Sequence, residues 1–310
     1  MKIVIFGGGG FIGSTIADRL LRDGHALRIF ERPRVPPYRE FHDGESVEWM
    51  TGDFGSLHDI NTALDGVDAV LHLVSTTLPK SSNDDPVYDV QSNLVSTLQL
   101  LNAMEARHVR RIVFISSGGT VYGTPQYLPV DEKHPTEPQV SYGITKLAIE
   151  KYLQLYQAQH GIKATILRVA NPYGERQRIE TAQGAIAVFT SRALRGLPIE
   201  IWGDGSVMRD YLYVSDVAEA FALALGYDGP ETVFNISSGT GISLKDMVAI
   251  LARSIGREIV LDYRPGRPFD VPVSILCNAL ALRELGWAPQ VSLEHGIHKT
   301  VDWMRKGLQQ

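Results

Sequence analysis

The sequence predicts an α/β protein with a doubly wound parallel sheet and a smaller C-terminal lobe. Short apolar runs of β-branched and aromatic residues alternate with segments of helical spacing, which is the pattern of such a sheet. A glycine-rich turn joins the first apolar run to the first helical segment. After about residue 171 the alternation loosens and Pro and Gly become frequent, which indicates the second lobe.

The elements follow in order from these patterns. Continuous apolar runs fit strands buried on both faces, and we expect them at residues 2–6, 27–30, 47–50, 69–73, 111–116 and 164–169. Apolar residues at helical spacing predict helices at residues 14–22, 57–64, 87–107 and 142–160. Polar ligands bind at the C-terminal strand ends in such sheets, so the loops that follow the strands should form one site.

The first strand is followed by three glycines, Gly7, Gly10 and Gly13. Glycine permits positive φ, lets the backbone approach a pyrophosphate and allows tight helix-on-strand packing. The helix that follows offers free N–H groups to anionic oxygens. The spacing is GxxGxxG, and its position between a strand and a helix predicts a dinucleotide-binding turn.

The second strand is followed by Glu31, eighteen residues beyond Gly13. A carboxylate at this position can accept both hydroxyls of a ribose and would repel the 2′-phosphate of NADP. We therefore expect NAD as the cofactor. The adjacent Arg32 keeps NADP open, because a guanidinium can bind a 2′-phosphate.

Tyr142 and Lys146 form a candidate acid/base pair. Residues four apart share one face of a helix, so the ammonium can lie close to the tyrosine. A nearby cation stabilises the phenolate, and we expect Lys146 to lower the pKa of Tyr142 from its usual value of about 10. The YxxxK spacing is also common on helix surfaces, and it is the glycine turn that favours the catalytic interpretation.

Composition excludes several other classes of protein. The net charge is −5, with no run of Lys or Arg, which argues against nucleic acid or an anionic membrane as partner. No apolar stretch approaches the ~18 residues of a membrane span, and the chain enters a core strand at once, so we expect a cytoplasmic protein. The nine histidines show no ligand spacing, so we expect no metal.

Ordered motifs along most of the chain give it a family resemblance. They are GGGGFIG at residues 7–13, ISSGGTVYG at 115–123, YGITK at 142–146, LRVANPYGERQ at 167–177 and GDGSVMRDYLYVSDVAEA at 203–220. The chain resembles the extended short-chain dehydrogenases/reductases, in the nucleotide-sugar epimerase branch typified by UDP-glucose 4-epimerase. The resemblance implies a Rossmann-type NAD-binding domain at residues 1–172 plus about 208–235. It places a nucleotide-sugar lobe at 173–207 and 236–310.

The resemblance also implies a reaction and the residues that perform it. A UDP-hexose is oxidised at C4 by hydride transfer to NAD, rotated as a 4-keto sugar and reduced on the other face. Tyr142 would take the C4 hydroxyl proton and Lys146 would hold the nicotinamide ribose. Other implied cofactor contacts are Gly7, Gly10, Phe11, Ile12, Gly13, Glu31, Arg32, Asp53, Phe54, Leu73, Val74, Ser75, Asn93 and Ser116. Implied substrate contacts are Thr77, Gly118, Asn171, Gln183, Trp202, Arg209, Arg267 and Asp270.

Departures from the family pattern limit what is carried over. A Ser or Thr is usual where this chain has Gly118, and Ser117 and Thr120 are the candidates to replace that catalytic hydroxyl. The Asp-Glu pair of the related 4,6-dehydratases is absent, since Gly119 and Thr120 stand there, so we reject dehydration. In the C-terminal lobe, Phe269 replaces a glycine of the family's RxGD pattern.

In some relatives a bulky residue restricts the sugar pocket, and this chain has the small residue Ser274 at that position. We therefore expect room for the N-acetylhexosamine or uronic acid forms of the substrate, unless Trp202 or another neighbour fills the space. Two other functions stay open. One is an NAD(P)H-dependent nucleotide-sugar reductase, and the other is a non-catalytic NAD(P)-sensing protein.

The helices at 87–107 and 142–160 resemble the pair that forms a four-helix dimer interface in relatives, so we expect a homodimer.

Overall fold

Seven parallel strands form the central sheet, in the order β10-β6-β5-β4-β1-β2-β3. The structure is a computed structural model and describes residues 1–177, 184–266 and 271–308. The strands are β1 (Lys2–Phe6), β2 (Ala26–Glu31), β3 (Val47–Thr51), β4 (Ala69–His72), β5 (Arg111–Ser117), β6 (Lys163–Val169) and β10 (Val233–Ile236). The strand order reverses at β1 and β4, so a crevice forms beyond their C-terminal ends.

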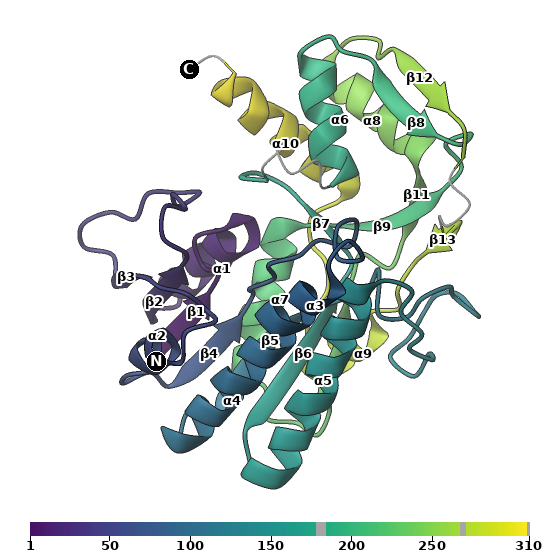
Figure 1. Cartoon of the computed structure of the whole chain (residues 1–310). Helices are drawn as coiled ribbons and strands as arrows, with labels where there is room; N and C mark the ends of the chain where they lie inside the picture. Colours follow the sequence, from purple (N-terminus) through teal and green to yellow (C-terminus); the bar gives the residue numbers. More distant parts are fainter. Residues whose placement is uncertain (178–183, 267–270, 309–310) are drawn as a thin grey trace.

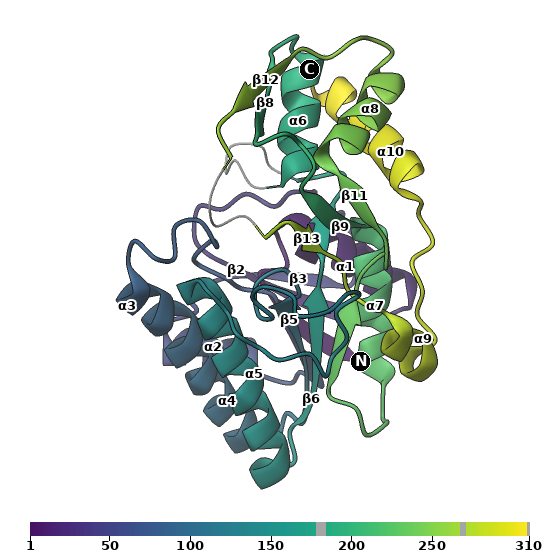
Figure 2. The same cartoon turned by 90° about the vertical axis from the view of Figure 1, so that its right-hand side faces the viewer.

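Helices cover both faces of this sheet, which confirms the doubly wound fold (Figure 2). One face carries α2 (Leu57–Ala63), α4 (Ser96–Ala106) and α5 (Ser141–His160), and the other carries α1 (Phe11–Arg22), α7 (Val214–Gly226) and α9 (Ala279–Leu285). Successive residues of a strand point to opposite faces. In β1, Ile3 and Ile5 join the core under α1, whereas Val4 and Phe6 join the core under α4.

The predicted strands and helices all occur, with ends shifted by up to three residues. The helices α7 and α9 were not among the predicted elements, and two further features of the sheet and its helices were not predicted. The first is β10, the strand at the edge of the sheet beside β6. The second is that the helix expected at 87–107 consists of α3 (Pro86–Asp89), a π-helical segment η1 (Val90–Val95) and α4. Such π segments occur often at functional sites.

The smaller lobe lies beyond the C-terminal strand ends (Figure 1). It contains a four-stranded sheet of β7 (Asn171–Tyr173), β9 (Met208–Tyr213), β11 (Gly241–Ser243) and β13 (Val273–Ser274). It also contains a strand pair, β8 (Ile199–Trp202) and β12 (Leu261–Arg264), and helices α6 (Ala185–Leu194), α8 (Leu244–Ile255) and α10 (Leu293–Gly307). These helices share a core of their own, whereas α9 returns to the core of the large sheet. The predicted division into domains stays a prediction.

Among the described residues, none of the helices has the length and apolar character that a bilayer crossing demands. The cytoplasmic location expected from the sequence stays a prediction.

Candidate active site

The glycine turn after β1 is packed so closely at Gly13 that a side chain is excluded there. A Cβ built on Gly13 would lie 2.3 Å from the carbonyl oxygen of Gly7 and 2.7 Å from the Cα of Gly8. Gly7 itself has a φ of 84°, in the left-handed region that favours glycine. The turn therefore brings the N-terminus of α1 directly against the end of β1, as a pyrophosphate-binding turn requires.

A cavity of about 590 Å³ opens beside this turn, at the point where the strand order reverses. Of the predicted cofactor contacts, it is lined by Gly7, Gly10, Glu31, Arg32, Asp53, Phe54, Leu73, Val74 and Ser75. Gln99 also lines it, and the buried amide oxygen of Gln99 has no hydrogen-bond partner in the described part of the chain. The close glycine turn, the carboxylate of Glu31 and this unpartnered acceptor fit a dinucleotide.

Glu31 ends β2 at the rim of this cavity, and Arg32, which also lines it, is exposed. The Glu31 carboxylate accepts a hydrogen bond of 3.0 Å from the backbone N–H of Arg32. This contact keeps the carboxylate at the strand end, where a ribose would meet it, and supports the preference for NAD.

The other predicted cofactor residues lie outside the lining of this cavity. Phe11 and Ile12 begin α1 beside the cavity, and Gly13 packs against the backbone of Gly7 and Gly8. Asn93 is buried, and its side-chain oxygen accepts the N–H of Thr76 at 2.9 Å. Ser116 is buried as well, and its hydroxyl donates to Glu150. The side chains of Asn93 and Ser116 therefore bond other protein groups that surround the site.

Tyr142 and Lys146 lie on the first turns of α5, as predicted. The Lys146 side chain is buried, and its ammonium donates a hydrogen bond of 3.1 Å to the carbonyl of Ile115. The same ammonium lies 4.7 Å from the ring centroid of Phe114 and 5.6 Å from that of Tyr142. The pair thus sits against the C-terminal end of β5.

The predicted lowering of the Tyr142 pKa is wrong for the protein on its own. Burial raises the pKa of Tyr142 to about 12, and hydrogen bonding from Ser75 opposes this rise only in part. Burial also lowers the pKa of Lys146 to about 8. Burial removes hydration from both groups, and this effect outweighs the attraction between them on which the prediction rested.

The first turn of α5 is capped by side chains from a distant segment of the chain. The N–H of Ser141 donates to the side-chain oxygen of Asn83 at 2.8 Å, and the N–H of Tyr142 donates to the hydroxyl of Ser82 at 3.0 Å. These bonds satisfy helix N–H groups that have no partner within the helix. The orientation of Tyr142 is therefore tied to the loop before α3.

Gly118, at the end of β5, has a neighbour that excludes the missing side chain. A Cβ built there would lie 2.3 Å from a methyl carbon of Leu276 and 3.2 Å from the carbonyl oxygen of Arg168. Of the two candidate replacements, the Thr120 hydroxyl is buried with no hydrogen-bond partner among the described residues. Ser117 is half-buried and ends β5, so both stay candidates.

Gly118→Ser is expected to lower the free energy of unfolding by about 1–3 kcal/mol, because the new Cβ overlaps Leu276 in a packed core. Urea unfolding of Gly118→Ser, Leu276→Ala and the double variant measures this. The double variant should lose less stability than the sum of the two single losses, since the truncation makes room for the serine. If the stability loss of the double variant equals the sum of the two single losses, Leu276 does not exclude the hydroxyl.

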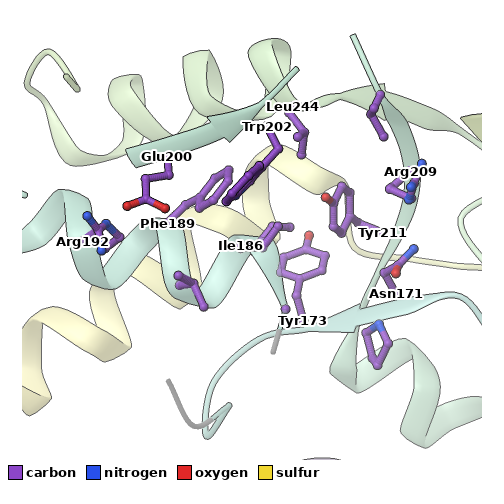
Figure 3. A pocket seen from close by; sticks show the side chains of 15 residues that line it. Asn171, Tyr173, Ile186, Phe189, Arg192, Glu200, Trp202, Arg209, Tyr211 and Leu244 are labelled. Atoms are coloured by element: carbon purple, nitrogen blue, oxygen red, sulfur yellow. The ribbon is translucent and has the colours of Figure 1, made fainter. Parts of the chain in front are cut away.

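A second cavity, of about 400 Å³, lies between β7, β8, β9 and α6 (Figure 3). Three predicted substrate residues line it: Asn171, Trp202 and Arg209. The Asn171 amide donates to the carbonyl of Asp210 at 2.8 Å, and the Arg209 guanidinium donates to the carbonyl of Val271 at 2.7 Å. These contacts hold both polar side chains at one end of the cavity.

The sequence did not single out the rest of this lining. Figure 3 shows Arg192 and Glu200 at the end of the cavity opposite Asn171 and Arg209. Between the two ends lie the aromatic side chains of Tyr173, Phe189, Trp202 and Tyr211. The cavity therefore suits an elongated ligand with a planar ring and anionic groups.

The remaining predicted substrate contacts are placed differently. Thr77 is buried, and its hydroxyl donates to Asp89. Ser274 lies on β13, paired in register with Arg209, and is half-buried. Three further predicted contacts lie outside the described residues, namely Gln183, Arg267 and Asp270. Phe269, noted as a departure in the sequence, lies outside them too.

Comparison with known proteins gives relatives that match nearly the whole chain. A family model described as the NAD dependent epimerase/dehydratase family matches residues 3–237. UDP-glucose 4-epimerase of Mycolicibacterium smegmatis is 35% identical, over 98% of this chain and 99% of the relative. dTDP-4-dehydro-6-deoxyglucose reductase of Escherichia coli is 31% identical, over 98% of this chain and 97% of the relative. The crystal structure of Thermotoga maritima UDP-glucose 4-epimerase with UDP-glucose superposes with a TM-score of 0.93, at 34% identity, over 99% of this chain and 100% of that one.

Proposed function

Because the chain belongs to the NAD dependent epimerase/dehydratase family, we propose that it interconverts the C4 epimers of a UDP-hexose with NAD as cofactor. The observation that carries this proposal is that Tyr142 and Lys146 lie beside the glycine turn's cavity, since Tyr142 is hydrogen-bonded with Ser75 of its lining and Lys146 donates to Ile115 at the end of β5. Several relatives are UDP-glucose 4-epimerases, the one from M. smegmatis among them, and they support UDP-glucose/UDP-galactose as the first pair to test.

In this proposal the chain binds the cofactor through the glycine turn and Glu31. Bound NAD would supply the hydride chemistry at C4 of the sugar, namely removal from one face and return to the other. Tyr142 takes the proton from the C4 hydroxyl during oxidation and gives a proton back during reduction. Lys146 supplies positive charge beside the phenol ring, which favours the phenolate over the neutral phenol.

We assign the second cavity to the nucleotide diphosphate of the substrate. Trp202 and Phe189 offer aromatic surface to a planar base, and Arg209 offers a guanidinium to the diphosphate. Asn171 lies at the same end of the cavity as Arg209, and it begins β7 two residues after the end of β6 in the large sheet. Ser274, beside Arg209, supports testing N-acetylated and uronic acid substrates along with the unmodified hexoses.

The test is to incubate the purified protein, without added cofactor, with UDP-glucose, UDP-galactose, their N-acetyl forms and UDP-glucuronate. Product sugars are separated by chromatography, and bound NADH is followed by absorbance. Equilibration of one C4 pair without net formation of NADH would support the epimerase and name its substrate. Rejection of both N-acetylated sugars would refute the prediction drawn from Ser274.

A second candidate function is an NAD(P)H-dependent nucleotide-sugar reductase. Arg32 favours it, because a guanidinium that lines the cofactor cavity can bind the 2′-phosphate of NADP, and the E. coli reductase among the relatives agrees with it. Conversion that requires added NAD(P)H, with one cofactor consumed for each sugar, would replace the epimerase proposal by this one. A sensor would bind NAD and a UDP-sugar with no turnover under either condition.

We also propose the division into two domains that the sequence predicts. We further propose a homodimer formed through the helices at residues 86–106 and α5. These helices pack side by side on one face of the sheet (Figure 2). Large apolar side chains on them are exposed, among them Tyr88, Val95, Ile144, Tyr152 and Leu155. A second copy would cover this apolar surface in a four-helix arrangement.

Ile144→Glu combined with Leu155→Glu is expected to convert the dimer into a monomer, because each carboxylate would be buried without a partner in the interface. Light scattering after size-exclusion chromatography measures the mass. Leu282→Glu is the matched control, because Leu282 is 56% exposed on α9, which covers the other face of the sheet. A wild-type protein of monomer mass would contradict the proposal.

A further inference from the structure

Asp89 is a buried carboxylate beside the Tyr142–Lys146 pair, and it has no part in the proton and hydride transfers proposed above. It ends α3, where the π-helical segment begins, and its side chain is 0% exposed. A buried carboxylate is destabilising unless hydrogen bonds or opposite charges compensate its lost hydration. Its partners therefore indicate why it is there.

Four donors surround the two carboxylate oxygens of Asp89. One oxygen accepts the Thr77 hydroxyl and the Asn93 amide, the latter at 2.9 Å. The other oxygen accepts the hydroxyl of Ser141 at 2.7 Å and that of Thr145 at 2.8 Å. All four groups donate, which is the pattern that an ionised carboxylate requires.

Two of these donors precede the catalytic pair directly in the sequence. Ser141 is followed by Tyr142, and Thr145 is followed by Lys146. Residues four apart lie one above the other on a helix, so a single carboxylate oxygen can hold both turns. The other two donors, Thr77 and Asn93, belong to the loop after β4 and to the π-helical segment.

We propose that Asp89 is a positioning residue for the reaction, whose carboxylate fixes the turns of α5 that present Tyr142 and Lys146. The proposal rests on the proposed function, because it assigns a role within that reaction. The caps from Ser82 and Asn83 hold the helix start through its backbone, whereas Asp89 holds it through the side chains that flank the pair. Small displacements of reacting groups lower rates by up to about 100-fold.

The negative charge of Asp89 gives the role a second consequence. It raises the pKa of Tyr142 and that of Lys146, since it disfavours the phenolate and favours the ammonium. Of the other charges near the pair, Glu150 on α5 acts on Lys146 in the same direction, and it is paired with Arg168 of β6 at 2.6 Å. His72 of β4 is buried, and burial together with Lys146 lowers the pKa of His72 well below its usual value, so it stays neutral.

Removing the charge of Asp89 should therefore lower the pKa of both members of the pair. The active form carries the phenolate of Tyr142 and the ammonium of Lys146. Lowering the pKa of both groups therefore moves both limbs of the rate profile to lower pH. A side chain that serves stability alone would reduce the rate without moving either limb.

The test compares Asp89→Asn with the charge-matched control Asp84→Asn, whose exposed carboxylate lies five residues away. The kcat for the UDP-sugar that the wild type converts is measured from acid to alkaline pH. We expect Asp89→Asn to lower kcat about tenfold or more and to shift the whole profile to lower pH, while Asp84→Asn does neither. A profile of Asp89→Asn that coincides with that of the wild type would overturn the proposal.

A second variant keeps the carboxylate of Asp89 and removes the two hydrogen bonds that join it to α5. Ser141→Ala combined with Thr145→Val should lower kcat while leaving the pH limbs in place, and it should speed hydrogen exchange in residues 141–146. Full activity with unchanged exchange would overturn the proposal, even if Asp89→Asn fails to fold. A wild type that converts none of the UDP-sugars would refute the proposed function instead, and hydrogen exchange would still test the hold on α5.

Discussion

Tyr142→Phe is expected to lower kcat by about 100- to 10,000-fold, the range for loss of a general acid/base. The benzene ring stays, so the ring that lies near the Lys146 ammonium is kept. Only the hydroxyl that exchanges a proton with the C4 oxygen is lost. Affinities for NAD and for UDP should therefore change little, and calorimetry of both ligands checks this.

The matched control is Tyr152→Phe, the same change on the same helix at a residue that is 37% exposed. It should keep wild-type kcat. Retention of most of the activity by Tyr142→Phe would remove Tyr142 from the reaction and leave Thr120 or Ser117 as the acid/base candidates. Equal losses in both variants would point to an effect on the helix.

Gly13→Val is expected to abolish tight NAD binding and to lower the free energy of unfolding by about 1–3 kcal/mol. The new Cβ would meet the carbonyl oxygen of Gly7 at 2.3 Å, and these are backbone atoms that cannot rotate away. The turn would have to open, which moves the N-terminus of α1 away from the pyrophosphate. Protein purified from cells should then carry little or no bound NAD.

Gly226→Ala is the control for this change, because a Cβ built there meets no described atom within 4 Å apart from its chain neighbours and the backbone of its own helix, and φ is not positive. Thermal unfolding with and without added NAD measures both effects. NAD should raise the midpoint of the wild type and of Gly226→Ala but not that of Gly13→Val. A normal NAD-induced rise in Gly13→Val would place the cofactor somewhere other than the glycine turn.

The large sheet could be predicted because its strands are continuous apolar runs separated by helical spacing. β10 escaped prediction because a buried run of four residues has no period that distinguishes it from other apolar segments. The π-helical segment at Val90–Val95 also escaped, since its apolar spacing fits an ordinary helix. Side-chain hydroxyls bond backbone carbonyls there, as Thr97 does to Asn93 at 2.6 Å, and these contacts appear only in the folded chain.

The candidate site could be predicted where its residues form local motifs. The YxxxK spacing and the glycine turn identified Tyr142, Lys146 and the cofactor cavity from neighbouring residues in the chain. Asp89 could not be found in this way, because its donors come from residues 77, 93, 141 and 145. The predicted direction of the shift in the Tyr142 pKa was wrong for a similar reason, since burial depends on tertiary packing.

Hydride removal from C4 and its return to the same carbon is the central claim, and an isotope label at C4 tests it most directly. The protein is incubated with UDP-glucose that carries deuterium at C4, in ordinary water, and the product UDP-galactose is examined by mass spectrometry and NMR. We expect the product to keep its deuterium at C4, because the hydride does not exchange with water between the two steps. Loss of the label to water would contradict the account, because it would require the C4 hydrogen to leave as a proton.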